Sequence, residues 1–290
     1  MTVEALVSTI ATLSGLLFVV CSMLAMGLAL PASAMIQPLK NVRLVILALL
    51  ANFVLVPLLG VIIIRLIPLE EPLQIGLILL ATAAGAPFIP KLVQGAKGNV
   101  GAAVGLMFLI MVVTIFYLPL VLPLLLPGVE VDPLEIAKSL IVSMLIPLLI
   151  AMLIRSHSPD VATHWAPVMN KISSLAVLIL LVAGIGMNLS NILGFIGTRG
   201  IGALVLLFAG ALAIGLLFGG RDPGIRTAMA LSTGNRNGAA AILVAGLNFA
   251  GTDTLPFLLV GVIVMLLVLL PAAKVLGGRN APAAPAPQAQ

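Results

Sequence analysis

A compact set of polar side chains lies inside an apolar segment, in the stretch LSTGNRNG (Leu231–Gly238). Its hydroxyl, amide and guanidinium groups belong to Ser232, Thr233, Asn235, Arg236 and Asn237. GIRTAMA precedes the stretch and AAAILVAGLNF follows it, so the whole segment is long enough to cross a bilayer. An arginine at the centre of such a span costs about 2.5–3.5 kcal/mol on insertion scales. These groups are therefore typical of a site that handles a polar ligand inside the membrane.

The composition indicates a helical membrane protein. Hydrophobic residues make up 62% of the chain and charged residues 8%, whereas a soluble domain has about 25% charged residues. The apolar runs are unbroken, which argues against the alternating pattern of a β-barrel. The net charge of +5 is interpreted as inner-loop charge rather than nucleic-acid binding. Cys21 is the single cysteine, so we expect no disulfide and no cysteine metal site. The sequence also has no metal-ligand cluster and no phosphate-binding GxxxxGK(S/T) motif, so we expect no cofactor.

The apolar pattern predicts an all-α polytopic protein with nine transmembrane helices, each near the ~20 residues that a bilayer requires. We assign residues 1–278 to one transporter domain and expect residues 279–290 to form a disordered, low-complexity tail. The expected spans are roughly 5–30, 44–66, 73–96, 100–126, 134–155, 167–189, 201–219, 224–250 and 254–276.

The distribution of basic residues predicts the orientation. If the N-terminus is outside and the spans alternate, nine loop or end cations lie inside and three outside, as the positive-inside rule requires. We therefore expect an inner (plasma) membrane protein with a cytoplasmic C-terminus. The inside set is Lys40, Arg43, Lys97, Arg155, Lys171, Arg221, Arg226, Lys274 and Arg279, and the outside set is Arg65, Lys138 and Arg199.

The third and eighth expected spans contain helix-breaking residues. Gly85, Pro87 and Pro90 interrupt the third, and Gly234 and Gly238 interrupt the eighth. The two spans are five apart, and five further spans reverse the orientation, which predicts inverted repeats over about 5–126 and 134–276. Paired interrupted spans in inverted halves are the best sequence indication of a transporter's central site.

The acidic residues all fall in loops or at span ends, so Arg236 has no carboxylate partner within the membrane. It can use backbone carbonyls, asparagine oxygens, water or an anionic ligand, and we favour the anion because an unpaired buried charge is costly. For the other candidate site residues, a purely structural role is the alternative to substrate binding. Lys91 can snorkel to the inner surface, Asn235 and Asn237 can satisfy free backbone groups, and Asn52 can form a helix–helix hydrogen bond.

Several segments resemble the bile acid:sodium symporter family. They are MGLAL (Met26–Leu30), ANFVLVP (residues 51–57), AKGNV (Ala96–Val100) and the GN-x-NG-x-A pattern around Asn235–Ala239. The resemblance implies inverted five-helix repeats in which a panel domain packs against a core domain with two discontinuous, crossing helices. This chain resembles a version without the first of ten helices.

The chain departs from the family at the sodium ligands. Where the family has a Ser-Asn pair, this chain has Ile89 and Pro90, and hydroxyl ligands on the next span are replaced by Ala103 and Met107. The family's glutamate position falls on Ser232 and a glutamine position on Arg236, while Asn52 stands where another glutamine is expected. Sodium binding is therefore doubtful, and our hypothesis is that Lys91 and Arg236 stand in for bound sodium ions.

These observations predict a secondary transporter, not an enzyme, that moves a small or amphipathic organic anion by alternating access. The substrate is expected to contact Arg236, Asn235, Asn237, Lys91 and Asn52, together with Ser232 and Thr233. Its partners would be the anion and the lipid bilayer, with no nucleic acid. A sodium symporter, proton coupling through Lys91 and a non-transporting sensor or scaffold of the same fold stay open as alternatives.

Overall fold

The protein is described by a computed structural model that covers residues 3–126, 132–187, 189–195 and 198–279. These residues form helices and no strand, which confirms the predicted all-α class. The expected tail beyond Arg279 lies outside the described residues. In chain order the helices are α1 (Val3–Ala29), α2 (Ala32–Ile36), η1 (Gln37–Lys40), α3 (Val42–Leu50), η2 (Ala51–Leu55), α4 (Val56–Leu66), α5 (Glu71–Thr82), α6 (Ile89–Gly95), α7 (Val100–Leu125), α8 (Pro133–Leu140), η3 (Ile141–Leu145), α9 (Ile146–His157), α10 (Pro159–Met187), α11 (Leu189–Phe195), α12 (Arg199–Phe218), α13 (Pro223–Gly234), α14 (Gly238–Asn248) and α15 (Thr254–Arg279).

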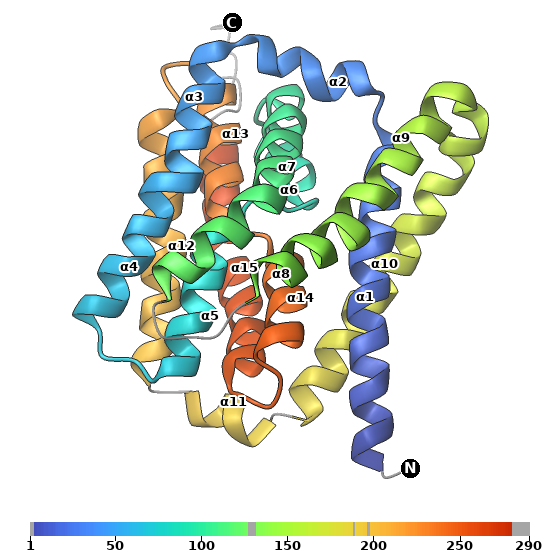
Figure 1. Cartoon of the computed structure of the whole chain (residues 1–290). Helices are drawn as coiled ribbons and strands as arrows, with labels where there is room; N and C mark the ends of the chain where they lie inside the picture. The colour runs from blue at the N-terminus through green and yellow to red at the C-terminus, as the bar shows by residue number, and fades with distance from the viewer. Residues whose placement is uncertain (1–2, 127–131, 188, 196–197, 280–290) are drawn as a thin grey trace, which may run out of the picture.

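Among the described residues, six helices are long and apolar enough to cross a membrane. A seventh span results if α1 and the α2–η1 segment, which meet at an angle of 99°, are taken together. The nine expected spans are not all continuous helices, because the third is divided into α5 and α6 and the eighth into α13 and α14. In Figure 1 the two halves of each divided span extend toward opposite ends of the molecule.

Two spans carry a π-helical turn directly before a proline. The turns η2 and η3 precede Pro57 and Pro147, the second residues of α4 and α9. Proline has no N–H to donate to the carbonyl four residues earlier, so the local ladder of hydrogen bonds is disturbed. The Phe53 carbonyl freed in this way accepts a hydrogen bond from the Tyr117 hydroxyl at 2.7 Å. The π turn η2 also carries Asn52, which it presents to the protein interior.

The helices α1, α9 and α10 pack against one another and lie on the right of Figure 1. Gly27 allows the close approach of α1 to α9, because a Cβ atom there would lie 2.6 Å from that of Ala151. The buried hydroxyls of Ser22 and Ser173 join α1 to α10 at 2.6 Å. We call α1, α9 and α10 the three-helix group. Part of its packing forms a small apolar cluster of its own, made of Leu28, Ala151, Ala162 and Ala166.

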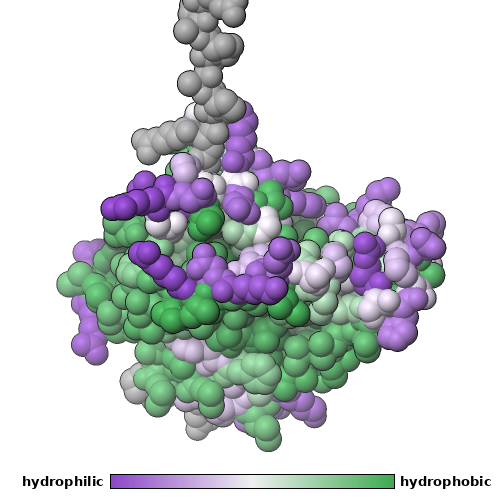
Figure 2. Space-filling view, turned by 90° about the horizontal axis from the view of Figure 1, so that it is seen from above, coloured by the Kyte–Doolittle hydropathy of each residue, from purple (hydrophilic) through white to green (hydrophobic). Residues whose placement is uncertain are grey.

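The main apolar core joins α3–α7 and α12–α15, and residues of α1, α8, η3, α9 and α11 also contribute to it. The flanks of the molecule expose large aliphatic side chains such as Leu120, Leu124 and Leu217. Figure 2 looks onto the end toward which α13 extends, where hydrophilic side chains run across the face and hydrophobic ones surround them. Because water does not favour such an apolar flank, the distribution is that of a protein embedded in lipid.

Candidate functional site

The breaks in the two divided spans meet inside the protein. The first break separates Thr82 from Ile89, and the second separates Gly234 from Gly238. The backbone N–H of Asn237 donates to the Ala83 carbonyl at 3.0 Å, and its side-chain amide donates to the Gly85 carbonyl at 3.2 Å. Asn237 also accepts from the Ala240 N–H at 3.1 Å and so caps α14. It therefore ties the second break to the first.

The first break is held against α7 at close range. Gly85 has a positive φ of 80°, which a glycine adopts without penalty. A Cβ atom at Gly85 would lie 2.3 Å from the Met111 backbone nitrogen, so only a hydrogen fits there. Thr114, one turn further along α7, accepts from the Ala84 N–H at 3.1 Å. The helix α7 thus fixes two residues of the break: its backbone packs on Gly85, and its Thr114 side chain bonds to Ala84.

Arg236 is fully buried at this meeting point and is the largest fully buried side chain among the described residues. Its Nε and Nη2 atoms donate to the Leu80 and Ala81 carbonyls at 3.0 and 2.7 Å. Both carbonyls belong to the last turn of α5, where helix geometry leaves acceptors without partners and the helix dipole is negative. The guanidinium therefore caps the C-terminus of a helix that lies more than 150 residues earlier in the chain.

The remaining contacts of Arg236 are also with neutral groups. Its Nη1 donates to Asn52 Oδ1 at 2.8 Å and to the Thr233 carbonyl at 3.3 Å, and its Nη2 lies 3.5 Å from the Asn52 carbonyl. Its backbone N–H donates to the Met265 sulfur at 3.2 Å. In the described part of the chain, no carboxylate bonds to Arg236. The guanidinium is thus fully hydrogen-bonded yet keeps its positive charge.

Asn52 orients this network from α3 and η2. Its side-chain amide donates to the Ala48 carbonyl at 3.0 Å and lies 3.4 Å from the Thr233 hydroxyl. Since these two bonds engage the amide nitrogen, the amide oxygen of Asn52 faces Arg236 and accepts from it. Asn52 thus does more than form a helix–helix hydrogen bond, because it also accepts from the buried guanidinium.

Ser232 and Asn235 differ from their neighbours because their side-chain polar atoms have no partner in the described part of the chain. Each residue is 1% exposed, yet Ser232 Oγ and both terminal atoms of the Asn235 amide make no hydrogen bond to any residue that the structure describes. Ser232 lies in the last turn of α13, and Asn235 is the residue that ends the helix, with an extended backbone (φ −85°, ψ 98°). Their neighbours Thr233 and Arg236 both bond to Asn52. Within this short stretch, two side chains are thus paired through Asn52, and two have no partner among the described residues.

Lys91 lies apart from this network. It is exposed on α6, and no hydrogen bond or ion pair joins it to Arg236 in the described residues. This exposure agrees with the alternative that Lys91 reaches the surface, and its part in substrate binding stays a prediction. The structure thus brings together six of the seven predicted site residues, namely Asn52, Ser232, Thr233, Asn235, Arg236 and Asn237.

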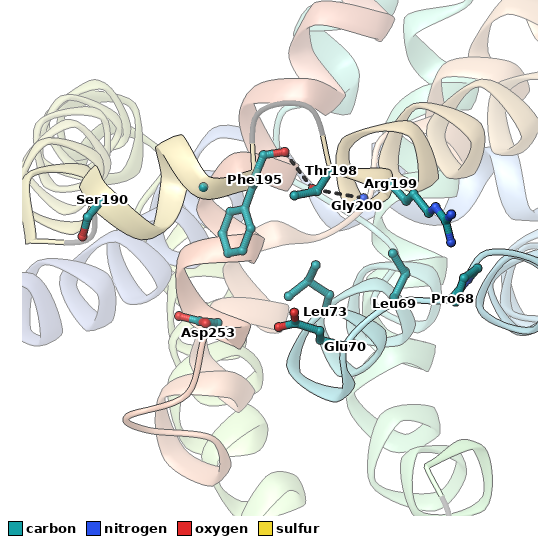
Figure 3. A pocket seen from close by; sticks show the side chains of 11 residues that line it. Pro68, Leu69, Glu70, Leu73, Ser190, Phe195, Thr198, Arg199, Gly200 and Asp253 are labelled. Atoms are coloured by element: carbon teal, nitrogen blue, oxygen red, sulfur yellow. Dashed lines mark hydrogen bonds between the residues drawn. The ribbon is translucent and has the colours of Figure 1, made fainter.

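A surface pocket of about 560 Å³ lies elsewhere, at the beginnings of α5, α12 and α15 (Figure 3). Glu70, Arg199 and Asp253 are the charged residues in its lining, and Phe195 points into it. None of the predicted site residues lines this pocket. It is a mixed-charge hollow formed where loops join the helices, separate from the breaks.

Sequence reasoning missed two residues that support the site, Tyr117 and Met265. Tyr117 donates to the Phe53 carbonyl, one residue from Asn52, and its ring packs on Phe53 with 4.8 Å between centroids. Tyr117 is the single tyrosine of the sequence, and this rarity could have drawn attention to it. Met265 gave no such indication among twelve methionines.

Comparison with known proteins agrees with this architecture. Residues 16–195, more than half of the chain, match the model of the sodium bile acid symporter family. The chain is also similar to the probable sodium/metabolite cotransporter BASS3, chloroplastic, of Arabidopsis thaliana, with 26% identity over 213 residues. The match covers 71% of this chain and 49% of the relative, so the chain spans about half the relative's length. The chain belongs to the sodium bile acid symporter family, whose members are membrane transporters and not enzymes.

Proposed function

We propose that this protein is a secondary transporter that moves a small or amphipathic organic anion across the membrane without sodium. The observation that carries the proposal is the state of Arg236, fully buried and bonded only to neutral acceptors. Its charge is stabilised by the carbonyls of α5 but is not neutralised. A fixed positive charge at membrane depth attracts an anion and repels a free cation.

The proposed absence of sodium coupling follows from the side chains around the breaks. By resemblance, the family positions that supply oxygen ligands fall on Ile89, Ala103 and Met107, and all three are buried apolar side chains here. At the position of a family glutamine, Arg236 places a guanidinium against the Asn52 oxygen. Hard cations prefer oxygen ligands, so this set offers sodium little. We propose that Arg236 takes the place of a bound cation and holds the breaks together.

The proposed mechanism is alternating access between two domains. The three-helix group would act as the panel, and α3–α7 with α12–α15 as the core. The divided pairs α5/α6 and α13/α14 count as two further spans, which brings the seven spans counted by length to nine. The substrate would bind beside the breaks and contact Asn235, Asn237 and Ser232, with Thr233, Asn52, Lys91 and Arg236 around it.

The proposed location is the inner (plasma) membrane, with the N-terminus outside and the C-terminus in the cytoplasm. An odd number of spans requires the two ends of the chain to lie on opposite sides. In Figure 1, α1 begins at the end of the molecule opposite to α13. The end of α15 lies near α13's side, because Gly277 approaches the Ala96 backbone in the loop after α6. The positive-inside bias then assigns this side to the cytoplasm.

Sodium-coupled transport is the second candidate, because the Arabidopsis relative is called a sodium/metabolite cotransporter. Uptake into proteoliposomes separates the two functions. The purified protein is reconstituted, and uptake of radiolabelled pyruvate (a short keto acid) and taurocholate (a sterol-sized anion) is measured in sodium, potassium and choline buffers. We expect the same rate in all three buffers. A rate that falls to background without sodium would establish the symporter instead.

A further inference from the structure

The end of α13 and the second break carry two features that the described residues leave unbalanced. The first is the charge of Arg236, which has neutral partners only. The second is the pair Ser232 and Asn235, whose side-chain polar atoms are buried and without partners. Native proteins pair nearly all such atoms, and each exception requires an explanation.

The chemistry of these groups defines what relieves them. The Asn235 amide and the Ser232 hydroxyl each offer both donors and acceptors, and Arg236, the residue after Asn235, adds a positive charge at the same break. A monovalent organic anion with polar oxygens supplies the missing negative charge and hydrogen-bond partners together. A bound water could pair the amide and the hydroxyl, but it would leave the charge of Arg236 uncompensated.

An alternating-access carrier passes through a closed state both with its substrate bound and without it. The loaded form is neutral at the breaks, and its polar atoms are paired. The empty form carries a desolvated charge and unpaired polar groups through the same closed state. Both terms raise the barrier for the empty form, because unsatisfied buried groups and unpaired charges are costly.

We infer that this protein is an anion exchanger, in which the loaded core crosses readily and the empty core does so slowly. This inference rests on the proposed function and adds a mode to it. The sodium symporter alternative has no such requirement. The inference assigns Ser232 and Asn235 the role of making return without a substrate unfavourable.

The test compares exchange with net uptake in proteoliposomes made with the full chain. Vesicles contain unlabelled pyruvate or no anion, and uptake of labelled pyruvate is followed with the membrane potential clamped at zero by potassium and valinomycin. We expect at least about tenfold faster initial uptake into the preloaded vesicles, the factor that one unpaired polar group produces. The same comparison is made with taurocholate.

Variants test whether the named residues cause the difference. Asn235→Leu and Ser232→Ala remove unpaired groups, so the ratio of exchange to net uptake should fall severalfold in each. Asn52→Asp places a negative charge beside Arg236 and should bring the ratio toward one. Asn248→Leu is the matched control, because the Asn248 amide donates to the Val244 carbonyl on α14, away from the breaks. It should keep the wild-type ratio.

The outcomes separate this inference from the proposed function. Equal uptake into preloaded and empty vesicles would overturn the exchanger and leave anion transport in place. A wild-type ratio that persists in all three site variants would also overturn the assigned roles. If neither anion is transported in any mode, the proposed function itself fails, and the exchanger fails with it.

Discussion

Arg236 Nη1 donates to Asn52 Oδ1 over 2.8 Å, although 184 residues separate the two in the chain. The bond connects the second break to the π-helical turn before Pro57. It also fixes where the charge of Arg236 resides, because the asparagine nitrogen is already directed to Ala48 and Thr233. The arginine is consequently a helix cap and a fixed cation at once.

Replacing Arg236 with alanine should destabilise the protein and abolish anion uptake. The Leu80 and Ala81 carbonyls and the Asn52 oxygen would lose their donor inside the protein, at about 1–3 kcal/mol for each unsatisfied group. Thermal unfolding in detergent measures the first effect, and proteoliposome uptake the second. Arg236→Lys keeps the charge but cannot reach acceptors in three directions, so it should recover part of the stability.

The control for that experiment is Arg226→Ala. Arg226 donates to the Leu216 carbonyl from an exposed position near the start of α13. Its loss should change stability by no more than about 1 kcal/mol. A correctly folded Arg236→Ala protein with unchanged anion uptake would refute the role that we give to Arg236.

The coupling between Asn52 and Arg236 is measurable by a double-mutant cycle. Asn52→Leu and Arg236→Leu should each destabilise the protein, and the pair should cost less than the sum. We expect a coupling free energy of about 1.5–3 kcal/mol, the range for a hydrogen bond to a charged group. The measurement is equilibrium unfolding of the four proteins. Additive effects would mean that the 2.8 Å bond contributes nothing.

Gly85→Ala should be strongly destabilising. The positive φ is unfavourable for alanine, and the new Cβ would overlap the Met111 backbone, which lies 2.3 Å away. We expect a loss of about 3 kcal/mol or more, because backbone atoms cannot move aside as side chains do. Gly246→Ala is the matched control in α14, where a Cβ atom meets nothing within 4 Å. It should be neutral or stabilising by up to about 1 kcal/mol. Similar melting temperatures for both variants would contradict the tight packing of the first break.

Lys91→Ala should leave stability within about 0.5 kcal/mol of the wild type, since the side chain is exposed. If Lys91 attracts the substrate, the KM for the anion should rise severalfold, and the dependence of KM on ionic strength should weaken. Lys274→Ala, at another exposed position, controls for a general change in surface charge. Identical kinetics in the two variants would remove Lys91 from the substrate path.

Much of the architecture can be predicted from the sequence. Long apolar runs predict helices, because a backbone in lipid must satisfy its own hydrogen bonds. Gly85, Pro87, Gly234 and Gly238 predict where two of those helices end. The number of uninterrupted spans is harder to predict from the sequence, because a divided helix such as α13/α14 has the same hydropathy as an intact one.

The sequence by itself determined that Arg236 lies deep in an apolar segment and has no acidic partner nearby in the chain. Only the tertiary structure decided which groups meet it, because the free carbonyls of Leu80 and Ala81 become acceptors when the two breaks are brought together. The same packing decided that Thr233 is paired with Asn52 and that the neighbouring Ser232 has no partner among the described residues. Residue type sets what a side chain can bond to, whereas the crossing of distant helices sets whether a partner is within reach.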